Sequence, residues 1–165
     1  MTRFNESTVE QAALDWLREI GYRTGYGPVD TAVGEVREHP FDVVLWDRLK
    51  AALLRLNPEA STQLIADALG RVQRADSQDT VLENQRLHDL MVKGVPVETK
   101  ASDGQTVTQL LRLIDFKNPE NNDWLALNQF TIIENGHNRR PDVFVFLNGL
   151  PVGLMELKNP ADEHA

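Results

Sequence analysis

The segment RRPDVFVFLNGLPVGLMELKNP, residues 139–160, holds two apolar runs on either side of an Asn-Gly pair. Asn-Gly between apolar runs is typical of a tight β-hairpin turn, because both residues readily adopt positive φ. The run VFVFL has no polar alternation, which predicts a strand buried on both faces. This hairpin therefore constrains the chain to a fold that is built around a β-sheet.

Three charged residues lie at the open end of this hairpin, namely Asp142, Glu156 and Lys158. Glu156 and Lys158 share a face because side chains alternate along a strand, and the hairpin returns them to Asp142. Two neighbouring carboxylates repel each other, and a hard cation such as Mg²⁺ relieves that repulsion. A lysine beside the cation can orient or help to deprotonate a bound water. The alternative is a surface ion pair between Glu156 and Lys158, with Asp142 capping a turn.

Strand parity adds a requirement to the cation interpretation. With a two-residue turn and a regular ladder, Asp142 pairs with Met155, and Glu156 points to the opposite face. A shared site therefore requires one extra residue in the hairpin. We predict a bulge within Leu150–Gly153, most simply at Leu150-Pro151, because proline cannot donate to the ladder. A three-residue loop, or an Asp142 outside the regular strand, would also satisfy the requirement.

The first helix is expected at about residues 6–20 and ends at Gly21. Asn5 and Ser7 are alternative N-caps, and Asn5 also allows a hydrophobic staple. On a helical wheel, Glu10 and Glu6 fall on the apolar side of this helix, which makes Glu10 the first and Glu6 the second candidate for an additional acid at the cation site. Both are also favoured in a first turn by the helix dipole. The apolar positions used for this assignment are Val9, Ala13, Trp16, Leu17 and Ile20.

The remaining chain changes from a helical period to a strand period. A glycine-rich connection follows the first helix, and three helices are expected within 41–93, the last ended by Gly94. From residue 95 the period is two, which predicts strands up to residue 158. We expect a single domain of α/β class over residues 1–165, with a mixed central β-sheet flanked by helices. Its helical block lies at 41–93 and its sheet at 95–158.

Composition limits the location and the partners of the chain. The chain has 165 residues, no cysteine and a net charge of −8. The absence of cysteine fits a reducing cytoplasm, and the sequence has neither a membrane-spanning run nor a signal-peptide pattern. The acidic balance counts against a free-standing nucleic-acid binder, although it allows a nuclease whose partners grip the DNA.

Together these residues resemble a known family. Pro141-Asp142 and Glu156-Leu157-Lys158 form the signature of PD-(D/E)xK nucleases. In their wider context, which includes ENQRLHDLMVKGVPVE and DFKNPENNDWLALNQFTI, they closely resemble the N-terminal nuclease domain of the restriction (R) subunit of type I restriction–modification enzymes. The start of the chain also resembles archaeal Holliday-junction resolvases, in which a helix-1 glutamate, here Glu10, precedes a Gly-aromatic pair.

The resemblance implies a restriction-endonuclease-like core with a helical insertion, and a Mg²⁺-dependent DNA endonuclease. Asp142, Glu156 and Glu10 would serve the metal site, and Lys158 the attacking water. Double-stranded DNA and the methyltransferase and specificity subunits would be the partners. ATP would be used only by the full-length subunit, because no phosphate-loop motif is present here. The family's Gln-x-x-x-Tyr element after the lysine is also missing, so we expect a fragment of a larger subunit, and both an active and an inactive isolated fragment are compatible with the sequence.

Two further expectations concern function. Arg139 and Arg140 flank Asp142 and are candidates for contacts with DNA phosphates, although both could be solvated turn residues. A different class of function is a nuclease-like fold that serves as a non-catalytic docking or DNA-binding module. The intact Asp142, Glu156 and Lys158 favour the enzyme, because a docking module does not need them.

Overall fold

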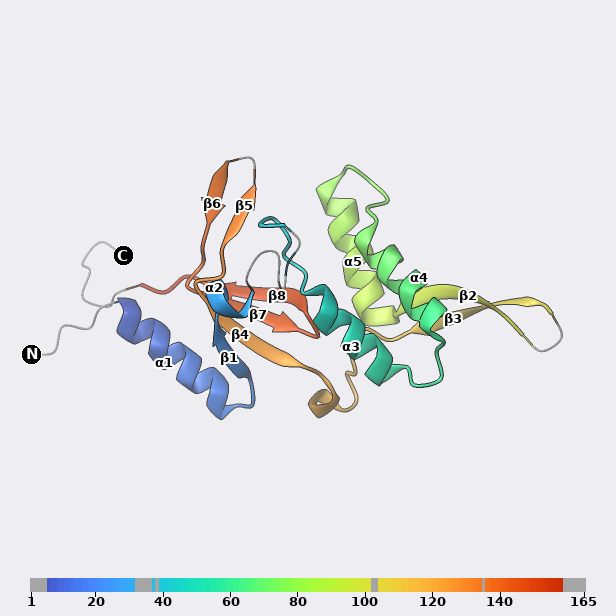
Figure 1. Cartoon of the computed structure of the whole chain (residues 1–165), viewed down its shortest axis with the longest axis horizontal. Coiled ribbons are helices and arrows are strands. Elements are labelled where there is room, and N and C mark those ends of the chain that lie inside the picture. The colour runs from blue at the N-terminus through green and yellow to red at the C-terminus, as the bar shows by residue number, and fades with distance from the viewer. Residues whose placement is uncertain (1–5, 32–36, 38, 102–103, 135, 159–165) are drawn as a thin grey trace, which may run out of the picture. The chain divides into compact units, whose positions relative to one another are not determined.

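The computed structural model describes residues 6–31, 37, 39–101, 104–134 and 136–158. The chain separates into two compact units (Figure 1). The first unit comprises Met1–Trp46 and Asp123–Ala165, and the second comprises Asp47–Asn122. The hairpin and Glu10 belong to the first unit. Asn5, one of the two proposed N-caps, lies outside the described residues.

A four-stranded mixed sheet forms the centre of the first unit, in the order β1-β4-β7-β8. β1 runs parallel to β4, whereas β7 is antiparallel to both β4 and β8. The registers align Tyr26, Asn128, Val143 and Met155 in a row across the sheet. This row ends β1, β4 and β8 and begins β7, so four strand termini meet at one end of the sheet. The strands are β1 (Arg23–Tyr26), β4 (Trp124–Asn128), β7 (Val143–Leu147) and β8 (Leu150–Met155).

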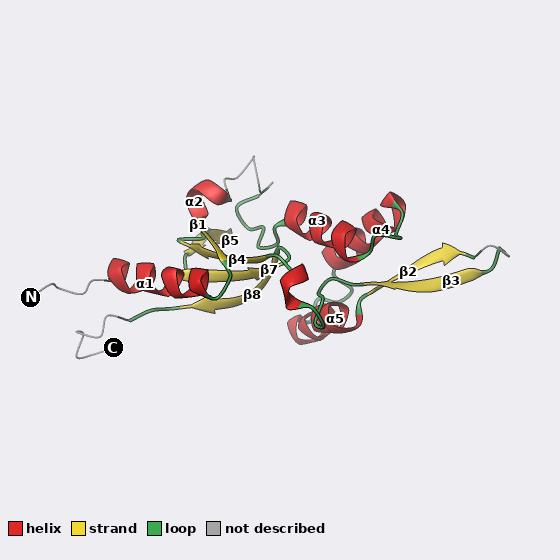
Figure 2. Ribbon diagram, turned by 90° about the horizontal axis from the view of Figure 1, so that it is seen from below, coloured by secondary structure: helices red, strands yellow, loops and turns green. Residues whose placement is uncertain are grey.

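One face of this sheet is covered by α1 (Glu6–Glu19), which Figures 1 and 2 show alongside the strands. Leu14 and Leu17 of α1 form a core cluster with Ala126, Val143 and Val145, against which Met155 and Leu157 also pack. The helix ends as predicted at Gly21, whose φ of 102° suits glycine, and Tyr22 N–H donates to Leu17 O.

The buried side of α1 differs in part from the predicted one. Trp16 is 69% exposed and Ile20 is 73% exposed, so their assignment to the apolar face was wrong. Glu10, Leu14 and Leu17 are buried instead, at the i, i+4, i+7 spacing of a single helical stripe. The prediction that Glu10 lies on the core side is confirmed.

The opposite face of the sheet is aromatic. Phe144 and Phe146 of β7 pack with Phe130, Leu45 and residues of β4 in a second core cluster. All five residues of β7 are buried, which confirms a strand covered on both faces. β4 ends at Asn128, and the chain continues into a separate hairpin of β5 (Ile132–Glu134) and β6 (His137–Arg139). A short helix, α2 (Gly27–Asp30), follows β1.

The second unit holds the expected helices and a separate β-hairpin (Figure 2). Ser61 caps α4, Asp79 caps α5, and Gly94 ends α5 with φ of 93°. β2 and β3 pair only with each other among the described residues, so the segment 95–111 does not belong to the central sheet, contrary to our expectation. That sheet consists of β1 and of three strands within residues 124–155. The elements are α3 (Trp46–Leu56), α4 (Thr62–Gln73), α5 (Thr80–Lys93), β2 (Val95–Lys100), β3 (Thr106–Leu111) and a 3-10 turn at Pro119–Asn121.

The chain therefore has a mixed α/β fold with a mixed sheet flanked by helices, which is consistent with a restriction-endonuclease-like core. None of the helices within the described ranges has the length and apolar character needed to cross a bilayer.

Candidate active site at the bulged hairpin

The hairpin contains the predicted bulge. Asn148 and Gly149 have φ of 53° and 83°, so they form a two-residue turn in which Leu147 pairs with Leu150. Phe146 pairs with Pro151, but the next residue of β7, Val145, pairs with Gly153. Val152 is therefore the extra residue. The bulge lies within the range 150–153 that we predicted, although one residue beyond the favoured Leu150-Pro151 position.

The bulge determines which residues oppose one another at the open end. Beyond it, Val143 pairs with Met155, and continuing this register by one residue places Asp142 opposite Glu156. Residues opposite each other on antiparallel strands share a face. Asp142 also accepts a hydrogen bond at Oδ2 from the Leu157 backbone N–H at 2.6 Å, which holds the two chain segments together just past the end of β8.

Glu156 and Lys158 flank Leu157 at this open end. Leu157 packs against the α1 core cluster, so alternation directs Glu156 and Lys158 to the other side of the strand. Both charged side chains are exposed, whereas Asp142 is half-buried. Within the part of the chain that the structure describes, neither Glu156 nor Lys158 has an ion-pair partner, including each other. The alternative of a Glu156–Lys158 ion pair is therefore not what the side chains form.

Glu10 reaches the same end of the sheet from the α1 face. Its carboxylate is 9% exposed and accepts from Asn128 Nδ2 at 2.5 Å and from Gln129 Nε2 at 3.0 Å. Both donors are neutral amides, and Glu10 has no ion-pair partner among the described residues. The two amides thus satisfy a buried carboxylate that would otherwise be costly to remove from water. Glu6 begins α1, but its side chain lies outside what the structure describes.

Gln129 connects Glu10 to the hairpin. It follows β4 with φ of 56°, a left-handed conformation that is uncommon for residues other than glycine. Its backbone N–H donates to the Asp142 carbonyl at 3.4 Å, while its side-chain amide donates to Glu10. Asn128 and Gln129 were not among the predicted site residues, because a helix–strand amide contact over more than a hundred residues leaves no local sequence pattern.

The structure thus brings Asp142 and Glu156 together by register and links Glu10 to Asp142 through Gln129. Asp142 and Glu156 point by parity away from the α1 face, from which Glu10 approaches. In the described residues no three His, Asp or Glu side chains already form a group that could hold a metal ion. Asp142 and Glu156 therefore stay the predicted cation ligands, and Glu10 lies at the same end of the sheet on the other face.

Arg139 is the last residue of β6, and Arg140 follows it on the way to β7. Both are exposed, and Arg139 pairs with Ile132 in the small β5–β6 hairpin. Their guanidinium groups are accessible to a ligand, but the described residues show no partner that would orient them toward Asp142. The proposed contact with DNA remains a prediction.

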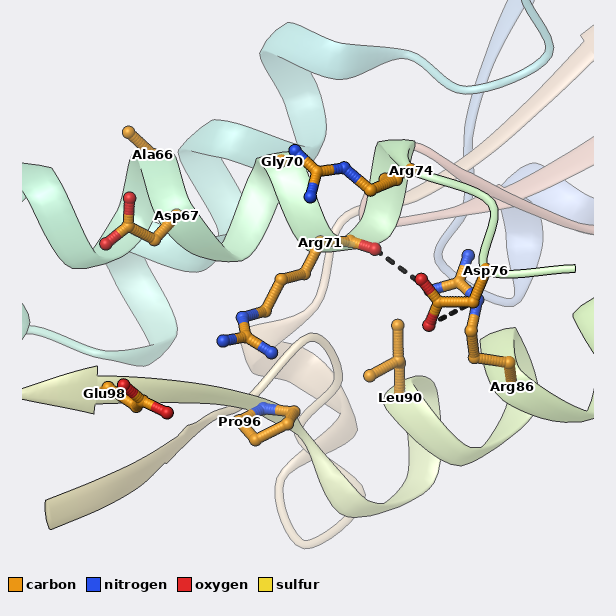
Figure 3. A pocket seen from close by; sticks show the side chains of 10 residues that line it. All are labelled: Ala66, Asp67, Gly70, Arg71, Arg74, Asp76, Arg86, Leu90, Pro96 and Glu98. Atoms are coloured by element: carbon orange, nitrogen blue, oxygen red, sulfur yellow. Dashed lines mark hydrogen bonds and ion pairs between the residues drawn. The ribbon is translucent and has the colours of Figure 1, made fainter.

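A hollow of about 840 Å³ lies in the second unit between α4, α5 and β2 (Figure 3). Its charges compensate each other. Arg86 is held by Glu83 at 2.7 Å and Asp76 at 3.9 Å, and also donates to Arg71 O. The remaining cations, Arg71 and Arg74, share the wall with two acids, Asp67 and Glu98, so the hollow lacks the single charge sign expected of a site for nucleic acid.

Asp115 anchors the loop that precedes β4. Its carboxylate accepts from Asn121 Nδ2, from the backbone N–H groups of Lys117 and Asn118, and from Asn118 Nδ2. These hydrogen bonds, with the Asn121 amide the largest contributor, lower the pKa of Asp115 from 3.8 to about 2. The loop segment DFKNPENND therefore has a structural explanation that needs no role in catalysis.

Comparison with known proteins shows which proteins the chain is similar to. The family described as "Type I restriction enzyme R protein N terminus" matches residues 3–165. The type I restriction enzyme HindI endonuclease subunit of Haemophilus influenzae is 34% identical over 165 residues, which cover 98% of this chain and 16% of that protein. A Methanocaldococcus jannaschii protein named as the MjaIXP endonuclease subunit is 33% identical over 162 residues, or 96% of this chain and 16% of its own length.

The chain thus spans about a sixth of the length of these relatives. The match covers the bulged hairpin, Glu10 and the second unit alike. The chain belongs to the family of type I restriction enzyme R protein N-terminal regions.

Proposed function

We propose that the chain is the Mg²⁺-dependent endonuclease domain of a type I restriction enzyme R subunit. It would hydrolyse phosphodiester bonds of unmodified foreign double-stranded DNA in the cytoplasm. The observation that supports this proposal most is the bulge at Val152, because the register of Val143 with Met155, when continued by one residue, gives the pair Asp142 and Glu156. A regular ladder would have separated these carboxylates onto opposite faces.

The donor set fits a magnesium ion. Mg²⁺ takes oxygen ligands, retains several waters and typically uses one or two carboxylates together with substrate phosphate. Asp142 and Glu156 would hold the ion, and the half-buried Asp142 is already oriented by the Leu157 N–H. Glu10 would assist from the neighbouring face, since its charge is not neutralised by any described cation. When bound, the ion would polarise a phosphoryl oxygen and lower the pKa of a water.

Lys158 would act on the proton of the attacking water. Its ammonium group lies on the same side of the strand as Glu156 by alternation, and is exposed to an incoming substrate. An ammonium group is a compact cation with three donors, which suits the orientation of a water beside a phosphate. Lys158 therefore has a role in the chemical step and not in binding the ion.

The complete enzyme would supply what this chain lacks. The named relatives are type I restriction endonuclease subunits about six times as long as the matched region. We infer that ATP-driven translocation belongs to other regions of the subunit, and that DNA recognition belongs to the methyltransferase and specificity subunits. The net charge of −8 accords with a domain that receives DNA from its partners.

The test uses the assembled restriction complex with an Asp142→Ala R subunit. The proposal expects loss of DNA cleavage with ATP hydrolysis and translocation retained, because only the metal site changes. Glu98→Ala, an exposed acid of β2, serves as the matched control and should cleave normally. Normal cleavage by Asp142→Ala would refute the proposed site, and would favour a docking or DNA-binding role for the domain.

A further inference from the structure

Gln129 has an unusual backbone for its residue type. Its φ of 56° places it in the left-handed region, where a β-carbon is unfavourable and glycine is the usual occupant. Glycine at this position would relieve the backbone, so the side chain must contribute something that glycine cannot. Left-handed residues of this kind concentrate at functional sites, where the surroundings hold them in place.

The side chain of Gln129 contributes one half of an amide pair around Glu10. Asn128 Nδ2 donates to one carboxylate oxygen at 2.5 Å, and Gln129 Nε2 donates to the other at 3.0 Å. A donor on each oxygen fixes both the position and the plane of the carboxylate. Because both donors are neutral, they orient Glu10 without cancelling its charge.

The main chain of Gln129 extends this contact to the hairpin. Its N–H donates to the carbonyl of Asp142 at 3.4 Å, one residue beyond the regular pairing of Asn128 with Val143. Gln129 thus contacts the carboxylate of Glu10 with its side chain and the backbone carbonyl of Asp142, the residue before β7, with its own N–H.

We propose that Gln129 is a positioning residue of the metal site, which fixes Glu10 relative to Asp142. This inference rests on the proposed function. Groups that orient the carboxylates of a metal site typically change its metal affinity about 10- to 100-fold when removed. Gln129 should therefore influence metal affinity although it contributes no ligand.

The experiment measures Mn²⁺ and Mg²⁺ binding to the 165-residue chain by titration calorimetry, with thermal unfolding recorded in parallel. Gln129→Met removes the amide at similar length and keeps the backbone cost, whereas Gln129→Gly removes both. Gln63→Met is the matched control, since Gln63 donates a comparable 2.9 Å hydrogen bond to Asp67 on α4. Glu156→Ala reports on the metal site itself.

We expect both Gln129 variants to bind metal about 10-fold or more weakly, with Gln63→Met unchanged. The glycine variant should unfold at a higher temperature than the methionine variant, yet bind metal no better. This combination separates positioning from stability.

Two results would overturn the assignment. If Gln129→Met binds metal like the wild type while Glu156→Ala loses binding, Gln129 is not a positioning residue, and the proposed function stands. Gln129 is also not a positioning residue if the metal affinities of its two variants change in parallel with their unfolding temperatures. If Glu156→Ala binds metal as the wild type does, the proposed site itself is refuted.

Discussion

Lys158 is exposed, and among the described residues it has no ion-pair partner. Its proposed role rests on its place two residues after Glu156 at the open end of the hairpin. We predict that Lys158→Ala in the full restriction complex lowers the cleavage rate by about 10²- to 10⁴-fold, the usual contribution of a group that moves a proton. Metal binding to the isolated chain should be unchanged.

The comparison for Lys158 is Lys100→Ala, which removes an exposed lysine from β2. Cleavage by that variant should equal that of the wild type. Cleavage at a normal rate by Lys158→Ala would show that the lysine does not act on the attacking water.

The positions of the acids on the hairpin and on α1 could be predicted from the sequence, whereas the contacts of Asn128 and Gln129 with Glu10 could not. Asp142, Glu156 and Glu10 follow from local patterns, namely a hairpin and a helical stripe. Gln129 depends on a contact between segments more than a hundred residues apart, and its left-handed backbone has no signal in its residue type.

In the hairpin, the bulge accommodates one extra residue and so keeps Asp142 in register with Glu156. Val152 is unpaired, so deleting it should give a regular ladder that still pairs Val145 with Gly153 and keeps Asp142 opposite Glu156. We predict that the deletion variant folds and binds metal like the wild type. Inserting one alanine between Met155 and Glu156 should abolish metal binding, because it turns Glu156 to the other face.

Calorimetric titration of the two hairpin variants with Mn²⁺ provides the measurement. Met155 and the residues before it keep their places in both variants, so far-ultraviolet circular dichroism should show intact folds. Tight metal binding by the insertion variant would contradict the requirement that Asp142 and Glu156 lie opposite each other.

The loop held by Asp115 should be sensitive to acid. The hydrogen bonds of its carboxylate lower the pKa to about 2 in the folded chain. A lowered folded pKa means that the stabilisation is fully present above the ordinary value of 3.8 and is lost as pH falls through about 2. We predict that Asp115→Asn is less stable than the wild type at pH 6 and that the difference disappears toward pH 2.

Urea unfolding monitored by tryptophan fluorescence across this pH range checks the prediction for Asp115. A stability difference between the two proteins that stays constant from pH 6 to pH 2 would contradict it.

The helices could be predicted more fully than the strands. Periodicity predicted α4 and α5, and Gly94 was correctly predicted to end α5, whereas the caps Ser61 and Asp79 are findings of the structure. In α1, apolar residues occur on several sides, so the pattern alone assigned Trp16 to the core although it is exposed. The bulge at Val152 lies one residue beyond the favoured position, because the absence of a proline N–H restricts pairing at Pro151 without specifying which neighbouring residue is left unpaired.

At the scale of the whole molecule, charge controls the interaction with DNA. With a net charge of −8, the isolated chain should bind duplex DNA weakly, and any binding should fall steeply as salt increases. Gel-shift titrations between 50 and 200 mM salt, about the range over which phosphate contacts lose most of their affinity, provide the measurement. Tight binding that is insensitive to salt would instead favour a DNA-binding module.

Whole-molecule organisation was the least predictable from the sequence. The alternation of residues 95–111 correctly predicts strands, but it carries no information on which sheet they join. In the structure they form their own hairpin within residues 47–122, while the glycine-rich connection supplies β1 to the central sheet. Strand partners depend on long-range contacts, which a period-two pattern does not specify.

Titration of the 165-residue chain with Mg²⁺ and Mn²⁺ tests the central claim, that the bulged hairpin creates one metal site from Asp142 and Glu156. Wild type, Asp142→Ala, Glu156→Ala and the control Glu98→Ala should be compared by calorimetry under identical conditions. We predict one binding event in the wild type and the control, and its loss in both hairpin variants. Equal binding by all four proteins would contradict a metal site at this hairpin.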